Sequence, residues 1–227
     1  MSALGRPRLH LRTTTSTNDR ARALAQAGAP HGTLVTASSQ TAGRGRQGRS
    51  WSASGDRALL LSLVLRDAPA LLPLAAALAV AEVAGEDARI KWPNDVLVHE
   101  RKVAGILAEA RPDAGWAILG IGLNVAVRMD DFPAELQATA GTLGLEPADI
   151  EPTLIRLLEA LERSLALDTA VLLEAYRARD ALRGREVRWA NGAGTAAGID
   201  GAGQLVVELP GGGRAALSAG EVHLERG

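Results

Sequence analysis

Residues 58–66, ALLLSLVLR, constrain the fold more than any other part of this chain. An apolar run of this length is typical of a strand that is buried on both faces of its sheet. Residues 71–84 follow it and are apolar enough to form a helix that faces the core. The chain has 227 residues, which is long enough for a large domain followed by a small one. We therefore expect a mixed α/β domain built around this buried strand.

The apolar pattern and the turn residues predict the other elements of this domain. Ser16 and Asp19 have capping-box spacing at the start of a short helix that ends at Gly28. Residues 153–183 are predicted to form one or two helices with a leucine stripe, and residues 127–145 a long, mobile loop. The expected strands are residues 9–11, 33–38, 58–66, 90–92, 95–98, 102–109 and 116–124.

The pattern of apolar and turn residues changes at Gly184. Short alternating segments follow, with glycine turns about every eight to ten residues, which is the pattern of a small β-barrel. We therefore expect one domain over residues 1–182 and a second, all-β domain over residues 183–227.

Charge and composition exclude several classes of protein. The formal net charge is −1, whereas proteins that bind nucleic acid through its phosphates usually carry a clear positive excess. Cysteine is absent, which removes disulfides, thiol nucleophiles and thiolate metal ligands, and the four histidines are far apart in sequence. The sequence shows neither a signal peptide nor an apolar span of ~20 residues. We expect a soluble cytoplasmic protein that does not bind a membrane.

Lysine occurs only twice, as Lys91 and Lys102, in a chain that otherwise uses arginine for its positive charge. The motif KWPND, residues 91–95, predicts a turn that places Lys91 and Asp95 at the ends of two adjoining strands. Lys102 opens the next strand, and Gly105 permits close approach of a ligand or another backbone. A carboxylate here can hold Mg²⁺ or orient an amine, and a lysine can neutralise a phosphoryl group. A surface turn with a Lys–Asp pair would explain the spacing, but not the presence of both lysines.

Residues 43–51, GRGRQGRSW, concentrate glycine and arginine between two predicted strands. Backbone N–H groups on a glycine-rich turn can surround an anion, and arginine adds charge-assisted hydrogen bonds. The segment matches neither a P-loop nor a dinucleotide fingerprint. RG-rich stretches also occur in disordered RNA-binding tails, but the position between strands favours a loop of a folded domain. We expect this loop to be poorly ordered without ligand, because its glycines and like charges have no evident internal partners.

Several motifs in this order resemble those of the biotin–protein ligases. They are TSTND (15–19), Gln40, GRGRQGRSW (43–51), KWPND (91–95), RKVAGIL (101–107) and GIGLN (120–124). The resemblance continues to SAGEVHL (218–224) and covers nearly the whole chain from about residue 9. GRGR-x-GR-x-W, KWPND and K-x-AGIL are highly specific in this order and spacing. The loop after Asn124 is too variable for an adenine-contacting residue to be assigned.

The resemblance implies an α+β fold of the class II synthetase type, with a mixed or antiparallel sheet, flanking helices and a terminal SH3-like β-barrel. It also implies a reaction in two steps. Biotin first reacts with ATP and Mg²⁺ to give biotinyl-5′-AMP, and a lysine of a biotin carboxyl carrier protein then receives the biotin. A homodimer formed through a sheet edge is known in this family.

The resemblance also assigns the site residues. Those expected to bind biotin are Ser16, Thr17, Asn18, Gln40, Gly43, Arg44, Gly45, Arg46, Trp51, Lys102 and Gly105. Those expected to bind the nucleotide are Arg44, Arg46, Trp51, Lys91, Asn94, Asp95, Lys102 and Asn124, with Asp95 on the Mg²⁺ side. Lys102, Arg44 and Arg46 are expected to be catalytic. Carboxylate and triphosphate repel each other, and these cations would hold them together.

Three other functions fit parts of the sequence. A lipoate or octanoate ligase or transferase of the same broad fold has no urea group to bind, whereas Ser16, Thr17 and Gln40 form a polar set that suits one. A DNA-binding repressor is not expected, because only about eight residues precede the first strand, too few for a helix-turn-helix. A biotin-binding module without catalysis would not explain the two lysines or KWPND.

Overall fold

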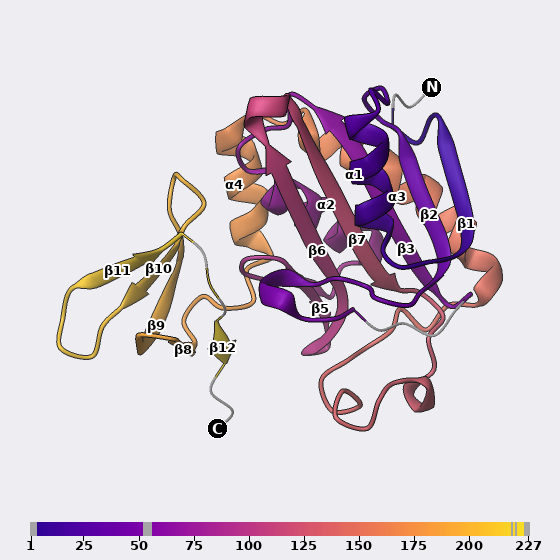
Figure 1. Ribbon diagram of the computed structural model, residues 1–227. Coiled ribbons are helices and arrows are strands. Elements are labelled where there is room, and N and C mark those ends of the chain that lie inside the picture. The colour runs from indigo at the N-terminus through magenta and orange to yellow at the C-terminus, as the bar shows by residue number, and fades with distance from the viewer. Residues whose placement is uncertain (1–3, 52–55, 219, 221, 225–227) are drawn as a thin grey trace.

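The computed structural model describes residues 4–51, 56–218, 220 and 222–224. Its main element is a seven-stranded sheet in the order β1-β2-β3-β7-β6-β5-β4 (Figure 1). β1 and β2 pair in parallel, and the other neighbouring strands are antiparallel. The strands are β1 (Arg8–Thr14), β2 (Leu34–Gln40), β3 (Ala58–Arg66), β4 (Ala88–Lys91), β5 (Asp95–Val98), β6 (Arg101–Arg111) and β7 (Trp116–Asn124). The expected mixed sheet is confirmed.

Strand β3 lies between β2 and β7 in the interior of this sheet and is buried on both faces, as predicted. Its odd-numbered leucines, Leu59 to Leu65, join the main core, whereas Val64 packs in a separate cluster with Ala21 and Ala25. Successive side chains of a strand point to opposite faces, so the run serves two apolar layers at once. This requirement explains why the strand carries almost no polar residue.

Helices cover both faces of the sheet (Figure 1). α1 (Thr17–Gln26) contacts β2, β3 and β7 on one face, and α2 (Leu72–Ala84) contacts β4, β5 and β6 on the other. α3 (Ile150–Leu165) packs against α2, and α4 (Thr169–Ala178) follows it. The predicted helical region is therefore two helices, and Leu154, Leu157 and Leu161 of the leucine stripe are buried.

The expected capping box at the start of α1 is not formed. Ser16 is the N-cap residue, but its side chain makes no capping hydrogen bond. Asp19 instead accepts from the guanidinium groups of Arg22 and Arg44. Ser16 is only 1% exposed, and the helix start is turned toward the interior rather than toward water.

Residues 127–145 are irregular, as expected, apart from one 3-10 turn, η3 (Met129–Asp131). They are attached to the sheet by backbone hydrogen bonds. Lys102 donates its N–H to Thr139, and the carbonyl of Lys102 accepts from Gly141. The backbone of Lys102 is thus fixed from the loop side. The other 3-10 turns are η1 (Arg46–Gly48), η2 (Pro112–Ala114) and η4 (Pro147–Asp149).

A second, antiparallel sheet follows in the order β11-β10-β9-β8-β12. Its strands are β8 (Glu186–Trp189), β9 (Gly192–Ile199), β10 (Leu205–Glu208), β11 (Arg214–Leu217) and β12 (His223–Leu224). Among the described residues no pairing joins β11 to β12, so the closed barrel that we expected is not found. Residues 219 and 221 of the SAGEVHL motif lie outside the described residues.

The second sheet is joined to the first through shared core and backbone contacts. Val187, Leu205 and Val222 belong to the same buried cluster as the leucines of β3. The indole N–H of Trp92, in the KWPND turn, donates to the carbonyl of Gly203 at 3.0 Å. In the described part of the chain, no helix has the length and apolar character needed to cross a membrane.

Leu63 tests the importance of β3, because it is fully buried in the main core. Leu63→Ala should lower the free energy of unfolding by about 2–5 kcal/mol, since it leaves a cavity between sheet and helix. Urea denaturation is the measurement. The control is Val171→Ala on α4, where Val171 is 51% exposed, and its effect should stay within about 0.5 kcal/mol. Equal effects of the two substitutions would contradict this packing.

Candidate active site

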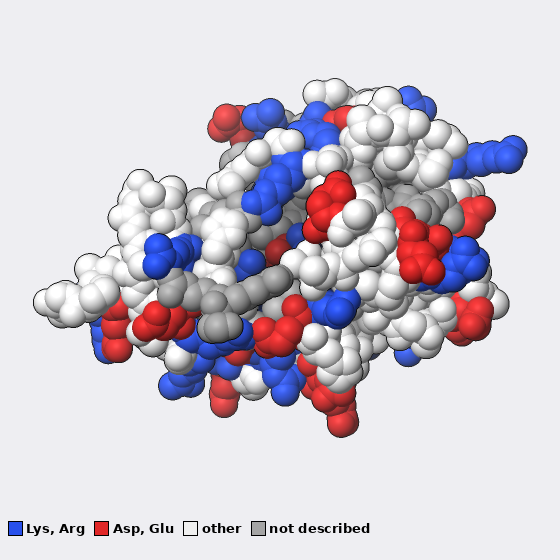
Figure 2. Space-filling model, turned by 90° about the horizontal axis from the view of Figure 1, so that it is seen from below, with Lys and Arg blue, Asp and Glu red and all other residues white. Residues whose placement is uncertain are grey.

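A cavity lies at the end of the main sheet where α1 begins and the KWPND turn reverses the chain. Figure 2 views this end of the molecule, where Lys and Arg side chains gather around a hollow. The predicted site residues in its lining are Ser16, Thr17, Asn18, Gln40, Arg44, Gly45, Arg46, Trp51, Lys91, Asn94, Asp95, Lys102 and Gly105. The structure therefore gathers residues that are up to about 90 positions apart in sequence.

Polar groups at the start of α1 form one wall of the cavity. Thr17 donates its backbone N–H to Oε1 of Gln40 at 2.7 Å and its hydroxyl to the same oxygen at 3.1 Å. Ser16, Thr17 and Asn18 are each at most 4% exposed. Buried polar groups need partners, and here the start of the helix and the end of β2 partly supply them. The hydrogen-bonding capacity that remains, including that of the Gln40 side-chain N–H groups, is available to a polar ligand in the cavity.

Ser62, the single hydroxyl in the apolar strand β3, was not predicted as a site residue. Its Oγ lies 2.6 Å from Asn18 Oδ1 and 2.8 Å from Thr17 Oγ1. Asn18 also packs directly on Gly120, where a Cβ would lie 2.1 Å from Asn18 Oδ1. One polar residue inside ALLLSLVLR was the available signal, because a buried hydroxyl requires a polar partner.

Trp51 lies across two adjoining strands that carry glycine at the contact. Gly105 of β6 and Gly122 of β7 are cross-strand partners. A Cβ would lie 2.9 Å from the Trp51 ring at Gly105 and 2.4 Å at Gly122. The indole Nε1 is buried and has no hydrogen-bond partner among the residues that the structure describes. An unpaired buried donor is costly, and this one is a candidate contact for a ligand.

The two lysines line the cavity near the KWPND turn, together with Arg46. Lys102 Nζ lies 2.7 Å from Asp95 Oδ1 and 5.6 Å from the centroid of the Trp51 ring. Arg46 donates to the side-chain oxygen of Asn94 at 3.1 Å. Asn94 is itself fixed, because its side-chain amide donates to the carbonyl of Ile106.

Burial lowers the pKa of Lys91, and the positive charges of Lys102 and Arg49 lower it further, while Asp95 acts in the opposite direction. Burial also lowers the pKa of Arg46, again with Asp95 opposing. Cations that are partly desolvated and close together gain when an anion enters. The electrostatics of this side therefore suit a highly charged anionic substrate.

Two predicted site residues are not in the cavity lining. Asn124 is 3% exposed. Its side-chain amide donates to the carbonyl of Gly141, and its backbone carbonyl accepts from the N–H of Leu143, so it anchors the loop over residues 127–145. Gly43 lies behind Trp51, where a Cβ would be 2.3 Å from the Trp51 carbonyl oxygen. The structure thus places both residues where they support the cavity walls.

The segment over residues 43–51 has internal contacts that the sequence did not reveal. Arg44 and Ser50 form a β-bridge, and Trp51 donates its N–H to Gly43. The Arg44 guanidinium pairs with the carboxylates of Asp19 and Glu109. The charge of Arg44 thus has partners outside the segment, and poor order of the segment without ligand stays a prediction.

The cavity also includes residues from the far end of the chain. Gly220 and Val222 belong to its lining, next to Trp92 and Pro93. No local sequence signal marks these C-terminal residues, because their proximity depends on the packing of the second sheet against the first.

Metal binding has limited support from protein groups alone. Among the described residues, no cluster of three or more His, Asp or Glu side chains could hold a metal ion. Asp95 is the one carboxylate among the described residues that line this cavity. A Mg²⁺ ion is often held by one or two carboxylates together with substrate phosphates, and Asp95 fits that arrangement.

Comparisons with known proteins agree with this architecture. The profile of the Biotin/lipoate A/B protein ligase family matches residues 10–125. The chain is 37% identical over 238 residues to the biotin--[acetyl-CoA-carboxylase] ligase of Mycobacterium tuberculosis, and the match covers 93% of this chain and 86% of that protein. A structure of the biotin protein ligase from Aquifex aeolicus in complex with biotin and ATP has a TM-score of 0.83 at 27% identity, covering 98% of this chain and 100% of that chain.

A further relative is longer than this chain. The bifunctional ligase/repressor BirA of Bacillus spizizenii is 43% identical over 141 residues, and the match covers 57% of this chain and 43% of that protein. The chain therefore spans less than half the length of this curated relative. The family profile, the sequence similarity and the fold agree: the chain belongs to the biotin/lipoate A/B protein ligase family.

Proposed function

We propose that this protein is a biotin–protein ligase that activates biotin with ATP and transfers it to a lysine of a biotin carboxyl carrier protein. One observation carries the proposal: a single cavity joins a buried polar wall, an aromatic wall and a set of cations. A ligand with a neutral urea-containing ring and a carboxylate tail would place its ring against the polar and aromatic walls and its tail against the cations. The M. tuberculosis relative is named a biotin--[acetyl-CoA-carboxylase] ligase, and the A. aeolicus structure contains biotin and ATP.

The polar wall would bind the ureido ring of biotin. The Oε1 atom of Gln40 already accepts from Thr17, so its amide group is left as a donor for the ureido oxygen. Ser16 adds a buried hydroxyl. Asn18 would shape the pocket, because its amide is held by Ser62 on one side and Glu109 on the other. Trp51 would cover the apolar part of the ligand.

The first step joins two anions. A biotin carboxylate oxygen attacks the α-phosphorus of ATP, a new O–P bond forms, and the bond to the β-phosphate breaks to release pyrophosphate. Lys102 would leave Asp95 and neutralise both the carboxylate and the α-phosphate, while Arg46 and Lys91 bind the remaining phosphates. Asp95 would hold Mg²⁺, and that ion supplies neutralisation of phosphate charge when bound.

In the second step, the neutral amine of the carrier lysine attacks the carbonyl carbon of the adenylate. The C–N bond forms, the C–O bond to phosphate breaks, AMP leaves with both electrons of that bond, and the attacking nitrogen loses one proton to solvent. Exclusion of water before the carrier arrives protects the mixed anhydride from hydrolysis. The segment over residues 43–51 adjoins the cavity and would provide that cover.

We further propose a division of the chain at residues 182 and 183. Residues 1–182 would hold the reactive groups, and residues 183–227, as an SH3-like domain, would support the KWPND turn through Trp92 and Gly203. We also propose that a homodimer, if formed through a sheet edge, uses β1. That strand is at one edge of the main sheet, whereas the other edge strand, β4, already pairs with Asp180 through Ile90.

The function itself is tested with purified protein, Mg-ATP, biotin and a carrier domain. We expect biotin on the carrier lysine, detected as an added mass, and none when ATP is omitted. Replacing biotin by lipoate should give no product, because lipoate leaves the buried polar wall unpaired, which binding sites of this kind penalise strongly. Transfer of lipoate but not of biotin would contradict the proposal.

Lys102→Ala should reduce the rate of biotinyl-5′-AMP formation about 100-fold or more, which is the scale for removing a group that stabilises developing charge. Its melting temperature should change little, because Lys102 is partly exposed and its ion pair with Asp95 contributes little to folding. The control is Arg214→Ala, which removes an exposed ion pair with Glu208 in the second sheet. An unchanged rate in Lys102→Ala would refute the role assigned to Lys102.

A further inference from the structure

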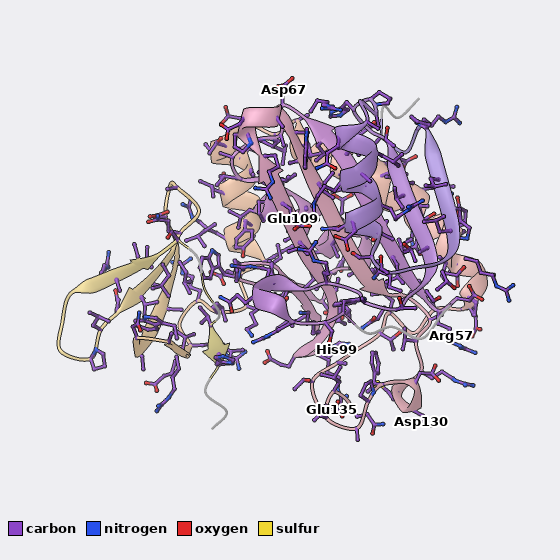
Figure 3. All side chains as sticks on the ribbon, in the orientation of Figure 1. Arg57, Asp67, His99, Glu109, Asp130 and Glu135 are labelled. Atoms are coloured by element: carbon purple, nitrogen blue, oxygen red, sulfur yellow. The ribbon has the colours of Figure 1, made fainter. Side chains whose placement is uncertain are left out.

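A row of hydrogen bonds leads from the polar wall of the cavity to Glu109, a residue of β6 that is not among the described residues of the cavity lining. The side-chain amide of Asn18 donates to Glu109 Oε2 at 2.7 Å, and Asn18 Oδ1 lies 2.6 Å from Ser62 Oγ. Ser62 Oγ lies 2.8 Å from Thr17 Oγ1, which lies 3.1 Å from Gln40 Oε1. Figure 3 shows Glu109 on the side of the sheet where helix α1 lies. These five side chains form one continuous set of contacts, the wall network.

Glu109 determines the orientation of the Asn18 amide. An ionised carboxylate only accepts hydrogen bonds, and Glu109 Oε1 already accepts from the guanidinium groups of Arg22 and Arg44 at 2.8 and 2.9 Å. Its Oε2 atom requires the N–H side of Asn18, because the opposite orientation would bring two oxygens together. Asn18 Oδ1 then faces Ser62, and the Ser62 hydroxyl has to donate its single hydrogen to that oxygen.

This orientation leaves the cavity end of the wall network short of one hydrogen. Because Ser62 donates to Asn18, the Thr17 hydroxyl has one hydrogen for two contacts, one with Ser62 Oγ and one with Gln40 Oε1. The backbone N–H of Thr17 donates to Gln40 Oε1 at 2.7 Å and fixes that oxygen as an acceptor. Thr17 is 4% exposed and Ser62 is fully buried, so the surplus acceptor needs a partner. Thr17 and Gln40 line the cavity, where an N–H group of a ligand can supply the missing donor.

We propose that Glu109 is a positioning residue that makes this wall accept hydrogen bonds from a ligand, and that it thereby selects a ring that carries N–H groups. It acts through Asn18 and Ser62. The direction of the wall network follows from the contacts and from the chemistry of the side chains. That the selected ring is the ureido ring of biotin rests on the proposed function.

Glu109→Gln is the informative substitution, because it should reverse the wall network with little change of shape. The two guanidinium groups require an acceptor, so the new amide turns its oxygen toward them and its N–H groups toward Asn18. The Asn18 amide then rotates and donates to Ser62, and the Ser62 hydroxyl donates to Thr17. The Thr17 hydroxyl is left to donate to Gln40. Each acceptor of the network then has a donor without a ligand.

The first readout is the affinity for biotin and for its two cyclic carbamate analogues, in each of which one ureido N–H is replaced by oxygen, measured by isothermal titration calorimetry. In the wild type, the analogue that lacks the N–H facing this wall should bind about 100-fold more weakly than biotin, because it leaves a buried acceptor unpaired. In Glu109→Gln, biotin should bind about tenfold more weakly than in the wild type, and its advantage over this analogue should fall to about tenfold.

Asp19→Asn is the matched control. Asp19 pairs with Arg22 and Arg44, as Glu109 does, whereas the contact with Asn18 belongs to Glu109. The preference of Asp19→Asn for biotin over the carbamate should therefore match the wild type. Combining Glu109→Gln with Asn18→Asp should bring the preference back to within about threefold of the wild type, because the relocated carboxylate accepts from both of its neighbours and restores the direction of the network.

Ser62→Ala interrupts the wall network and should lower the preference as Glu109→Gln does. A wild-type preference in both of these variants would overturn the proposal. An equal loss of preference in Asp19→Asn would also overturn it, because the ion pairs would then be responsible instead of the direction of the network.

The second readout needs no ligand. Neutron crystallography of the wild type locates the hydrogen of the Ser62 hydroxyl, which should point to Asn18 Oδ1. A hydrogen that points to Thr17 Oγ1 would overturn the proposal. Failure of the wild type to bind biotin, with the Ser62 hydrogen on Asn18, would contradict the proposed function and leave the direction of the wall network confirmed.

Discussion

The site depends on the absence of side chains at three positions of two neighbouring strands. Gly105 and Gly122 face each other across β6 and β7, and Gly120 lies two residues before Gly122 on the same face. A Cβ at Gly122 would overlap the ring of Trp51, and one at Gly120 would overlap the amide of Asn18. These contacts determine how closely Trp51 and Asn18 can approach the backbone of the sheet. Without bare backbone here, neither the aromatic wall nor the polar wall could lie flat on the sheet.

Charge is divided between the two sides of the cavity. Next to α1, the cluster around Glu109 is balanced, and its cations serve the structure. Near the KWPND turn, Arg46, Lys91 and Lys102 share the lining with one carboxylate, Asp95, among the residues that the structure describes. An anionic substrate would therefore be attracted to the second side, whereas the balanced charges of the first side suit a neutral ring. This asymmetry explains how one small cavity can orient a molecule with a polar neutral head and a charged tail.

Much of the main sheet could be predicted from the local pattern of apolar and turn residues. The bounds of β3 and β7 were predicted to the residue, and Lys91, Lys102 and Gly105 meet at the cavity as expected. Long-range contacts could not be predicted, because nothing in the neighbouring sequence identifies Glu109 as the partner of Arg44, or Gly203 as that of Trp92. The barrel was inferred from turn spacing, which predicts strands but not the pairing that closes them. Asn124 ends its strand with its side-chain N–H on Gly141, but its Oδ1 has no partner among the described residues, so its assignment to the nucleotide stays a prediction.

The most direct test of the account is the affinity for biotin of Gly122→Ala, measured by isothermal titration calorimetry. The matched control is Gly201→Ala, because a Cβ at Gly201 meets nothing within 4 Å. The account predicts that Gly201→Ala binds biotin like the wild type, whereas Gly122→Ala, still folded, loses at least about tenfold in affinity because Trp51 is displaced, about 1.4 kcal/mol. Equal affinity of both variants for biotin would contradict the claim that the bare strands shape the site.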